Sequence, residues 1–533
     1  MAVIAPQSDV FLLDVPLEIN DLNQLTFANA SKQFQYFNSL PKKEVHDFTY
    51  QRKDGTIRYG ANFDSLIKYN YVMYRNDAYS NKWFYAYIDH MEYLNDNVTA
   101  ISISTDVWQT WQFNLNFKRT FVEREHVNDD TIGNNTIDEG LEVGDYVINS
   151  SQTLMPSSTV TDYDGDNINA AYPIMFQVSE LATGFSIPSS MFNASYNRIF
   201  SGLYYFAVST PSDARDVIRR YDNAGKGDAI IAIFLVPGKL LQGAKKFGEL
   251  GYNMYIPQDN GHVTTLLSST SITRPSTLNG YSPKNNKMFV YPFSYVYVTN
   301  NTGIDTTFRY EDFASNTPKF MMAGAIGQGC TIKLCPVSYK KYTNNTEVFE
   351  YGVMGAKYPV CAWSSDYYTN WVTQNAVNMA VSAGSGILSA GISASYGNYA
   401  GTASSLLSTV GGIMAQHYQA QVHPDQAKGN LNGSDILPGW ERYYTVDCMS
   451  LRYEVARSID EFFSMFGYKV NRVKVPNRTG RRNWNYVKTV GCYIKADIPQ
   501  EDLEQIKSMF DKGITLWHNP ATFADYSQNN DIV

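Results

Sequence analysis

One short acidic segment has the residue types of a cation site. Its sequence runs Asp162-x-Asp164-Gly165-Asp166-Asn167. Carboxylate and amide oxygens are the ligands that hard cations such as calcium prefer, but the segment lacks the twelve-residue loop and the terminal glutamate of an EF-hand. A weak cation site at Asp162, Asp164 and Asp166 is therefore one interpretation. A solvated turn without a bound ion is the interpretation that we favour.

No catalytic or nucleotide-binding motif is recognisable in the chain. The patterns HExxH, GxxxxGK(S/T) and GxSxG are absent, and none of the seven histidines stands at metal-ligand spacing from another. The five cysteines include no CxxC pair, so neither a zinc site nor a disulfide framework is indicated. We predict no enzyme activity, no catalytic residue and no cofactor. A cell-wall glycan hydrolase, which needs only two suitably placed carboxylates, is kept as an alternative.

A cluster of basic residues beside a tryptophan has the composition of a surface that holds a phosphate backbone. Its members are Arg472, Lys474, Arg478, Arg481 and Arg482, followed by Trp484. The simpler interpretation, which we favour, is a solvated hairpin turn at residues 476–480 between two strands.

The most unusual feature is an uncharged stretch. Residues 367–424 contain no Asp, Glu, Lys or Arg, although 18% of the whole chain is charged. Gly, Ala and Ser make up more than half of residues 376–420. The large apolar residues that are spread among them are Val377, Met379, Val381, Ile387, Leu388, Ile392, Leu406, Leu407, Val410, Ile413 and Met414. A flexible linker would not need so many large apolar side chains.

The free energy of inserting this stretch into a membrane is close to zero. Large apolar residues at about −0.3 to −0.6 kcal/mol each sum to roughly −3 to −7 kcal/mol, and the Asn, Gln and Gly residues offset much of that. Two helices of about 16 residues would each be roughly 24 Å long, slightly short of the hydrocarbon core. We therefore predict a plug that stays in water when shielded and inserts only beside other copies. A purely structural packing loop is the alternative.

Hydrophobic patterning predicts the surrounding elements. Apolar and polar residues alternate over residues 101–121, which indicates a long half-buried strand, or two strands with a bend. Helices are expected over residues 211–225, from a capping box at Ser458 to Gly467, and over residues 499–513. We expect the last two helices to pack on a sheet of strands around residues 442–454, 468–475 and 484–494.

Composition sets the broad class. The chain has 533 residues, a net charge of −8 and 14% aromatic residues. The negative charge argues against a wide nucleic-acid-binding face, and the aromatic content favours β-structure. No signal peptide and no run of 18 apolar residues is seen. We predict a mainly β fold with a few helices, in segments 1–165 (β), 166–284 (mixed α/β), 285–366 (β), 367–437 (uncharged loop) and 438–533 (α+β).

Several segments together resemble the tail-knob, or distal tail-tube, proteins of small short-tailed phi29-like phages that infect Gram-positive bacteria. The similarity lies in residues 104–111 (STDVWQTW), 120–127 (TFVEREHV), 141–147 (LEVGDYV), 291–303 (YPFSYVYVTNNTG), 458–488 and 513–518 (GITLWH). No single segment is as specific as a zinc motif. Their number and order carry the resemblance.

The resemblance implies a homohexameric tube at the distal end of a phage tail, assembled from chains made in the host cytoplasm. Its β-barrel or sandwich domains would ring a channel for genomic DNA, which passes without sequence-specific binding. The loop at residues 367–437 would plug the tube and then enter the host cell membrane. The implied partners are other copies of the chain, other tail proteins and membrane lipids. A receptor-binding or adhesion module whose loop is merely structural is the alternative function.

Overall fold

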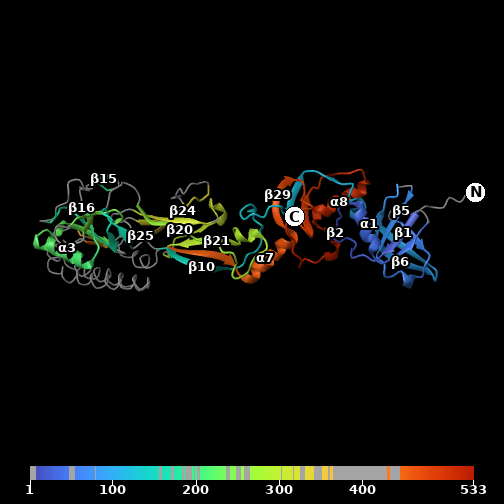
Figure 1. The fold of residues 1–533 in the computed structure, drawn as a ribbon, viewed down its shortest axis with the longest axis horizontal. Coiled ribbons are helices and arrows are strands. Elements are labelled where there is room, and N and C mark those ends of the chain that lie inside the picture. The colour runs from blue at the N-terminus through green and yellow to red at the C-terminus, as the bar shows by residue number, and fades with distance from the viewer. Residues whose placement is uncertain are drawn as a thin grey trace, which may run out of the picture. The chain divides into compact units, whose positions relative to one another are not determined.

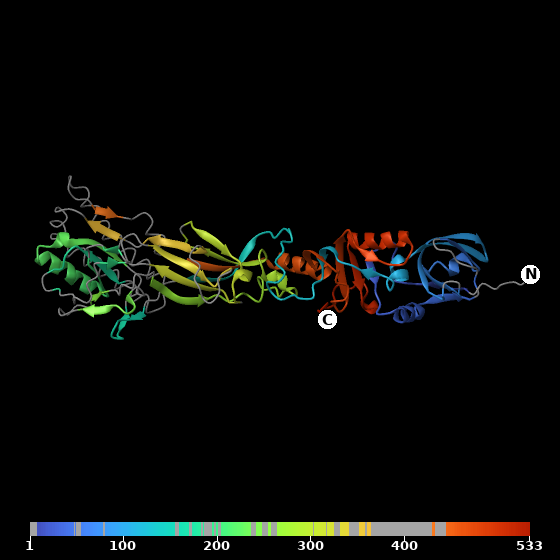
Figure 2. The same cartoon turned by 90° about the horizontal axis from the view of Figure 1, so that it is seen from above.

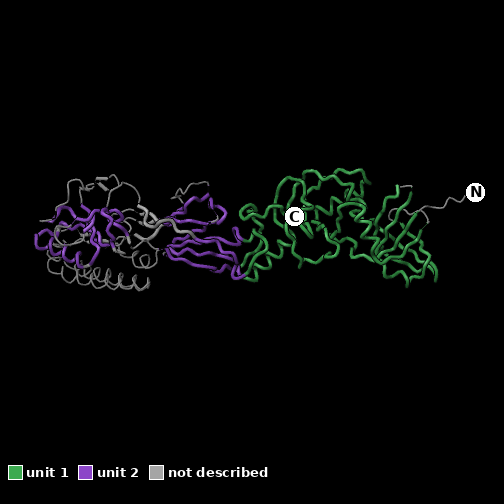
Figure 3. The backbone as a smooth tube through the Cα atoms, viewed as in Figure 1, with its two compact units in different colours: residues 1–144, 281–288, 453–533 green, residues 145–280, 289–452 purple. Residues whose placement is uncertain are grey.

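A computed structural model describes residues 8–46, 48, 55–77, 80–154, 159–169, 173–182, 185, 195–196, 199–200, 204–235, 241–247, 254–256, 264–301, 303–315, 317–324, 331–340, 351–357, 360–363, 429–431 and 444–533. The chain divides into two compact units (Figure 3), residues 1–144, 281–288 and 453–533, and residues 145–280 and 289–452. Both are built mainly of strands, which confirms the predicted class. The five predicted segments are a finer division, and their boundaries stay predictions.

The N-terminal part of the first unit is a six-stranded antiparallel sheet. In spatial order its strands are β3 (Lys42–Val45), β1 (Ser8–Leu13), β5 (Tyr71–Asn76), β6 (Phe84–Asn95), β7 (Val98–Thr105) and β4 (Thr56–Tyr59). Alternate residues of β1 and β5 enter two separate apolar clusters, because successive side chains of a strand point to opposite faces. Helix α1 (Ala30–Ser39) lies beside this sheet (Figure 1). Its Phe37 stacks on Tyr71 of β5, with ring centroids 5.6 Å apart.

A five-stranded mixed sheet completes the first unit. Its order is β2 (Asn23–Leu25), β32 (Ile514–Trp517), β30 (Trp484–Val490), β9 (Thr120–Glu125) and β29 (Tyr468–Lys474). Helices α7 (Tyr453–Phe466) and α8 (Gln500–Lys512) pack against β30 (Figures 1 and 2). A two-stranded pair joins β8 (Asn116–Phe117) to β31 (Ile494–Lys495). Helix α8 follows Pro499 and ends at Gly513, whose φ of +98° suits glycine, so this predicted helix is confirmed.

The second unit contains three larger sheets. One has the order β10 (Tyr146–Leu154), β28 (Tyr444–Leu451), β21 (Ser294–Thr299) and β22 (Asp305–Phe308). Another consists of β20 (Thr264–Ser271), β23 (Lys319–Gly324), β24 (Thr331–Val337) and β25 (Val353–Lys357). The third runs β18 (Lys245–Phe247), β19 (Met254–Ile256), β16 (Tyr204–Val208), β13 (Ile174–Val178), β17 (Ile230–Leu235), β26 (Val360–Trp363) and β27 (Gly429–Leu431).

Smaller elements complete this unit. Helix α3 (Pro211–Asn223) is capped by Thr210, and its face of Val217, Ile218 and Tyr221 is buried as predicted. Two short hairpins are β11–β12 (Thr159–Thr161, Asn167–Asn169) and β14–β15 (Ser195–Tyr196, Ile199–Phe200). One apolar cluster contains residues of all three larger sheets, so they share a core. Short 3-10 turns along the chain are Phe63–Ser65, Gly227–Ala229, Asn286–Phe289, Tyr310–Asp312 and Pro520–Thr522.

Residues 101–121 form neither the predicted long strand nor two strands joined only by a bend. Strand β7 ends at Thr105, and a short helix, α2 (Val107–Trp111), follows it. Asp106 caps this helix by accepting the backbone N–H of Gln109 at 2.9 Å. The helix buries four consecutive residues, 107–110, so the alternation in the sequence does not match the burial. The capping hydrogen bond of Asp106 favours a helix here, although the alternation of apolar and polar residues is typical of a strand.

Three predictions about the C-terminal part were also wrong. Helix α7 begins at Tyr453, so the supposed capping residue Ser458 lies inside the helix. Strand β28 belongs to a sheet of the second unit and does not pair with β29 or β30. Strand β9 lies between β29 and β30, so residues 476–480 are not the turn of a hairpin. In the two sheet cases a pairing with a distant segment determines the topology, and nearest-neighbour patterns do not report such pairings.

Candidate functional site

The eleven apolar residues predicted to plug and insert, from Val377 to Met414, lie outside the described residues. Their role stays a prediction. Among the helices that the structure does describe, none combines the length and the hydropathy needed to cross a bilayer.

The acidic segment forms the turn of the β11–β12 hairpin. One carboxylate oxygen of Asp162 accepts the backbone N–H groups of Asp164 and Asp166 at 3.0 and 2.8 Å. Asp162 is buried and its other oxygen has no hydrogen-bond partner in the described chain, whereas Asp164 and Asp166 are exposed. Within the described ranges no group of three metal-liganding side chains occurs. The geometry is that of an aspartate-stabilised turn, and cation binding stays a prediction.

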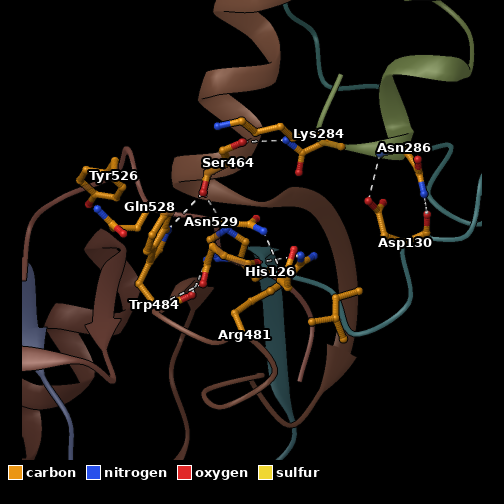
Figure 4. Close-up of a pocket in the computed structure, with 14 residues that line it drawn as sticks. His126, Asp130, Lys284, Asn286, Ser464, Arg481, Trp484, Tyr526, Gln528 and Asn529 are labelled. Atoms are coloured by element: carbon orange, nitrogen blue, oxygen red, sulfur yellow. Dashed lines mark hydrogen bonds between the residues drawn. The ribbon is translucent and has the colours of Figure 1, made fainter. Parts of the chain in front are cut away.

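A polar pocket of about 250 Å³ lies in the first unit (Figure 4). It is formed by residues 284–286, helix α7, strand β30 and the C-terminal segment. Asp130 and Asn286 are joined at its rim, since the Asn286 backbone N–H and side-chain amide donate to Asp130 Oδ2 and O at 3.0 and 2.8 Å (Figure 4). Burial raises the pKa of Asp130. Asn530 fastens the C-terminal segment by accepting the backbone N–H groups of Asn483 and Trp484.

His126 is the histidine of this pocket, and its hydrogen bonds fix its role. Its Nδ1 accepts the backbone N–H of Tyr486 at 2.8 Å, so Nε2 carries the proton and donates to the carbonyl oxygen of Ser464 at 3.2 Å. Burial, with the nearby guanidinium of Arg481, lowers the pKa of His126 to about 3. Both ring nitrogens are therefore occupied by backbone groups, and the ring serves as a neutral structural link instead of a general base.

Asp460 holds residues 281–288 in the first unit. Its carboxylate is fully buried in α7 and accepts hydrogen bonds from Tyr281 Oη (2.9 Å) and from the backbone N–H groups of Lys284 (2.8 Å) and Asn285 (3.0 Å). The Asn285 side-chain amide also donates to it at 2.9 Å. Sequence reasoning missed this residue, because a lone aspartate in an amphipathic helix ordinarily faces water.

A second buried carboxylate, Glu139, joins the same segment to the five-stranded sheet. It forms ion pairs with Arg124 of β9 and with Lys287, and it accepts the backbone N–H of Lys469 at 3.0 Å. The side chains of Glu139 and Lys287 are each only 1% exposed. A buried pair of this kind is costly to break because the remaining charge stays desolvated. These contacts tie residues 281–288 into the fold of the first unit.

A second hollow, which we call the acidic groove, occupies about 410 Å³ near strand β2. Its lining includes Ile19, Asp21, Gln24, Asp106, Glu501 and Asp502. Asp106 accepts a hydrogen bond from Tyr71 Oη at 2.8 Å, and Asp502 accepts one from Trp111 Nε1 at 2.8 Å. Both of these donors are uncharged, so they do not neutralise the carboxylates. Lys512 is the cation among the lining residues. The groove is therefore rich in acceptors and negative charge.

The predicted basic cluster does not act as one surface. Lys474 pairs with the buried Glu125, and Arg478 lies over the ring of Phe117 at 4.1 Å from its centroid. Arg481 lines the pocket of Figure 4 and donates to the carbonyl oxygen of Val127 at 2.9 Å. Arg472 is exposed on the edge strand β29. Arg482 is exposed as well, so three of the five basic residues make internal contacts and two do not. Whether the exposed residues bind phosphate stays a prediction.

Comparisons with known proteins identify the family. Residues 260–531 match the family described as Bacillus phage phi29 tail knob protein gp9, C-terminal domain, and residues 7–116 match the caudoviral major tail protein N-terminus. Tail knob proteins gp9 of Bacillus phages phi29 and PZA are each 26% identical, over 98% of this chain and 98% of theirs. The solved structure of the bacteriophage C1 tail knob protein gp12 has the same fold, with a TM-score of 0.67 at 12% identity, over 98% of this chain and 100% of that one. Since the phi29 family match spans more than half of the sequence, the chain belongs to the phi29 tail knob protein family, whose members are structural proteins of the phage tail.

Proposed function

We propose that this tail knob protein forms a hexameric tube at the distal end of the tail, that genomic DNA passes through this tube, and that the loops at residues 367–437 first plug it and then enter the host cell membrane. The uncharged stretch at residues 367–424 carries this proposal. In a phage tail protein, an uncharged stretch of this kind would insert where the tail meets the host cell membrane. Backbone groups in lipid must be paired within the segment, so the loops would become helical there.

The charge distribution supports a conduit that DNA can slide through. The chain carries a net charge of −8. Several cations of the first unit pair with carboxylates, including Lys287 with Glu139 and Lys474 with Glu125. Because phosphate binding requires unneutralised Lys and Arg, each of these pairs lowers the capacity of the first unit to hold DNA. The partners would be further copies of the chain, other tail proteins and membrane lipids, with no catalytic step.

Dye release from liposomes tests the membrane role. A peptide spanning residues 367–430 and the intact protein should both release dye from anionic liposomes. Leu388→Asp and Leu407→Asp should each suppress release, because an aspartate at a helix centre shifts the insertion free energy by about 3–4 kcal/mol, or roughly 100- to 1000-fold in partitioning. Gln426→Asp adds the same charge just outside the uncharged stretch and should leave release unchanged.

Two results would speak against insertion. One is a complete lack of release by peptide and protein at every pH and lipid composition, which would favour an adhesion module with a structural loop. The other is equal release by the wild type and both loop variants, which would assign the leakage to another segment.

A further inference from the structure

Two paired strands hold the ends of the uncharged stretch side by side. Strands β26 and β27 run antiparallel, with Trp363 opposite Gly429 and Cys361 opposite Leu431. Directly opposed residues of an antiparallel pair have Cα atoms about 4.5–5.5 Å apart. Strand β26 also pairs with β17, so these strands belong to the seven-stranded sheet. We call the pair β26 and β27 the root, because residues 364–428, which include the whole uncharged stretch, connect its two strands.

The root limits how many times this connection can cross a bilayer. Since its two ends lie next to each other on the same side, the number of crossings is even. One crossing requires about 20 residues. The uncharged stretch has 58 residues, which is enough for two crossings, whereas four would need about 80. Two crossings are therefore the largest number that the stretch permits.

The pairing register of the root places a turn signal at the centre of the connection. Tyr396 lies 33 residues from each of the paired residues Trp363 and Gly429. The dipeptide Gly397-Asn398 follows it, and both residue types favour tight turns. Tyr396 and Tyr399 flank this dipeptide, and tyrosine is enriched where a protein meets the membrane–water interface. The centre of the connection therefore has the composition of a hairpin tip.

The eleven large apolar residues fall on two arms, one on each side of Tyr396. Six of them lie in residues 377–392, and the range that mirrors these positions across Tyr396 is 400–415. The other five lie in residues 406–414, inside the mirrored range. Each arm has at least 28 uncharged residues, more than the about 20 that one crossing requires. The tip is uncharged as well, so no charged side chain has to pass through the hydrocarbon.

We propose that the uncharged stretch enters the membrane as a hairpin that crosses it twice, with its tip at residues 396–399, while the root stays paired. The inference rests on the proposed membrane entry and adds its topology. Because the root holds both arms together, each copy delivers two crossing segments at one place, and the sheet does not have to open. The tip reaches the far face of the bilayer, and the residues next to the root stay at the near face.

A disulfide across the root tests whether it stays paired. Leu431→Cys places a cysteine opposite the native Cys361, at a Cα separation that a disulfide tolerates. The oxidised full-length variant should release dye from anionic liposomes at the same rate as the reduced variant. The same substitution combined with Cys361→Ser cannot form this bond, so it controls for the oxidation itself.

Two results would overturn the closed root. One is slower release after oxidation, restored by reduction and absent from the control, because it would show that the strands must separate. The other is failure of the bond to form, measured by mass spectrometry, both in Leu431→Cys and in the second opposed pair, Trp363→Cys with Gly429→Cys. That failure would contradict the pairing of the strands.

A charge at the tip tests whether the hairpin crosses. Asn398→Arg should slow dye release about tenfold or more, because its guanidinium must pass through the hydrocarbon. Gln421→Arg adds the same charge near the root and should release dye as the wild type does. Equal release by both variants would overturn the crossing and indicate a stretch that lies on the membrane surface.

The wild type separates this inference from the proposed function. A wild type that releases no dye would overturn the membrane role and the hairpin together. Release by the wild type, combined with a failed root or tip test, would overturn the topology alone and leave the membrane role standing.

Discussion

Acidification should destabilise the first unit through His126. In the folded chain this ring is buried and neutral, with its pKa lowered to about 3, whereas the unperturbed value is 6.5. The unfolded chain therefore takes up a proton near pH 6.5 that the folded chain refuses until about pH 3. Stability is highest above pH 6.5 and falls as the pH drops through this window, because protonation favours the unfolded state.

The size of the effect follows from the width of that window. Each pH unit below the unfolded pKa costs about 1.36 kcal/mol while the folded chain stays neutral. At about pH 4.5, two units below the unfolded value, the loss from His126 is therefore about 2.7 kcal/mol. Protonation of Nδ1 in the folded state would also break the 2.8 Å hydrogen bond from the Tyr486 backbone. The folded state therefore opposes protonation of the ring.

Urea unfolding at neutral pH and at about pH 4.5, followed by tryptophan fluorescence, measures this loss. The first unit contains the buried Trp108, Trp484 and Trp517, which report on it. His126→Gln removes the titrating ring, so its pH dependence should be smaller than that of the wild type by about 2.7 kcal/mol. His90→Gln, at an exposed histidine, is the matched control and should keep the wild-type pH dependence. An identical pH dependence in the wild type and His126→Gln would refute the reasoning.

Two further substitutions test the described packing. Asp460→Ala removes the acceptor of four hydrogen bonds and leaves the two buried donors of Asn285 unpaired, so the free energy of unfolding should fall by about 2–5 kcal/mol; a loss below about 1 kcal/mol in urea titration would contradict the assigned role. Gly467→Ala should cost about 2–4 kcal/mol, since φ is +64° and a Cβ would lie 2.2 Å from the carbonyl oxygen of Glu125. Gly491→Ala, with φ of +67° and open space around it, isolates the backbone cost of about 1 kcal/mol, and equal losses at the two glycines would exclude the steric contribution.

Local signals in the sequence predicted the elements that local physics determines. Pro499 and Gly513 mark the ends of α8, and Thr210 and Pro211 mark the start of α3, because caps and restricted φ values act within one turn. The alternation over residues 101–121 misled for a related reason. Asp106 could cap a helix or sit in a strand, and burial of the whole turn against neighbouring elements decided for the helix.

Long-range features could not be predicted from one sequence. Asp460 and Glu139 join segments more than a hundred residues apart, and no local pattern distinguishes them from solvated carboxylates. The placement of β9 between β29 and β30 likewise depends on pairings across the whole chain. The loop that we propose to be membrane-active is the converse case. Its composition alone supports the prediction, and its residues lie outside the described structure.

Electron microscopy of the purified full-length protein tests the central claim most directly. The account predicts sixfold rings or short tubes that are closed at one end, with the closed end opening in the presence of liposomes. Particles that remain single chains at every concentration, with and without liposomes, would contradict it.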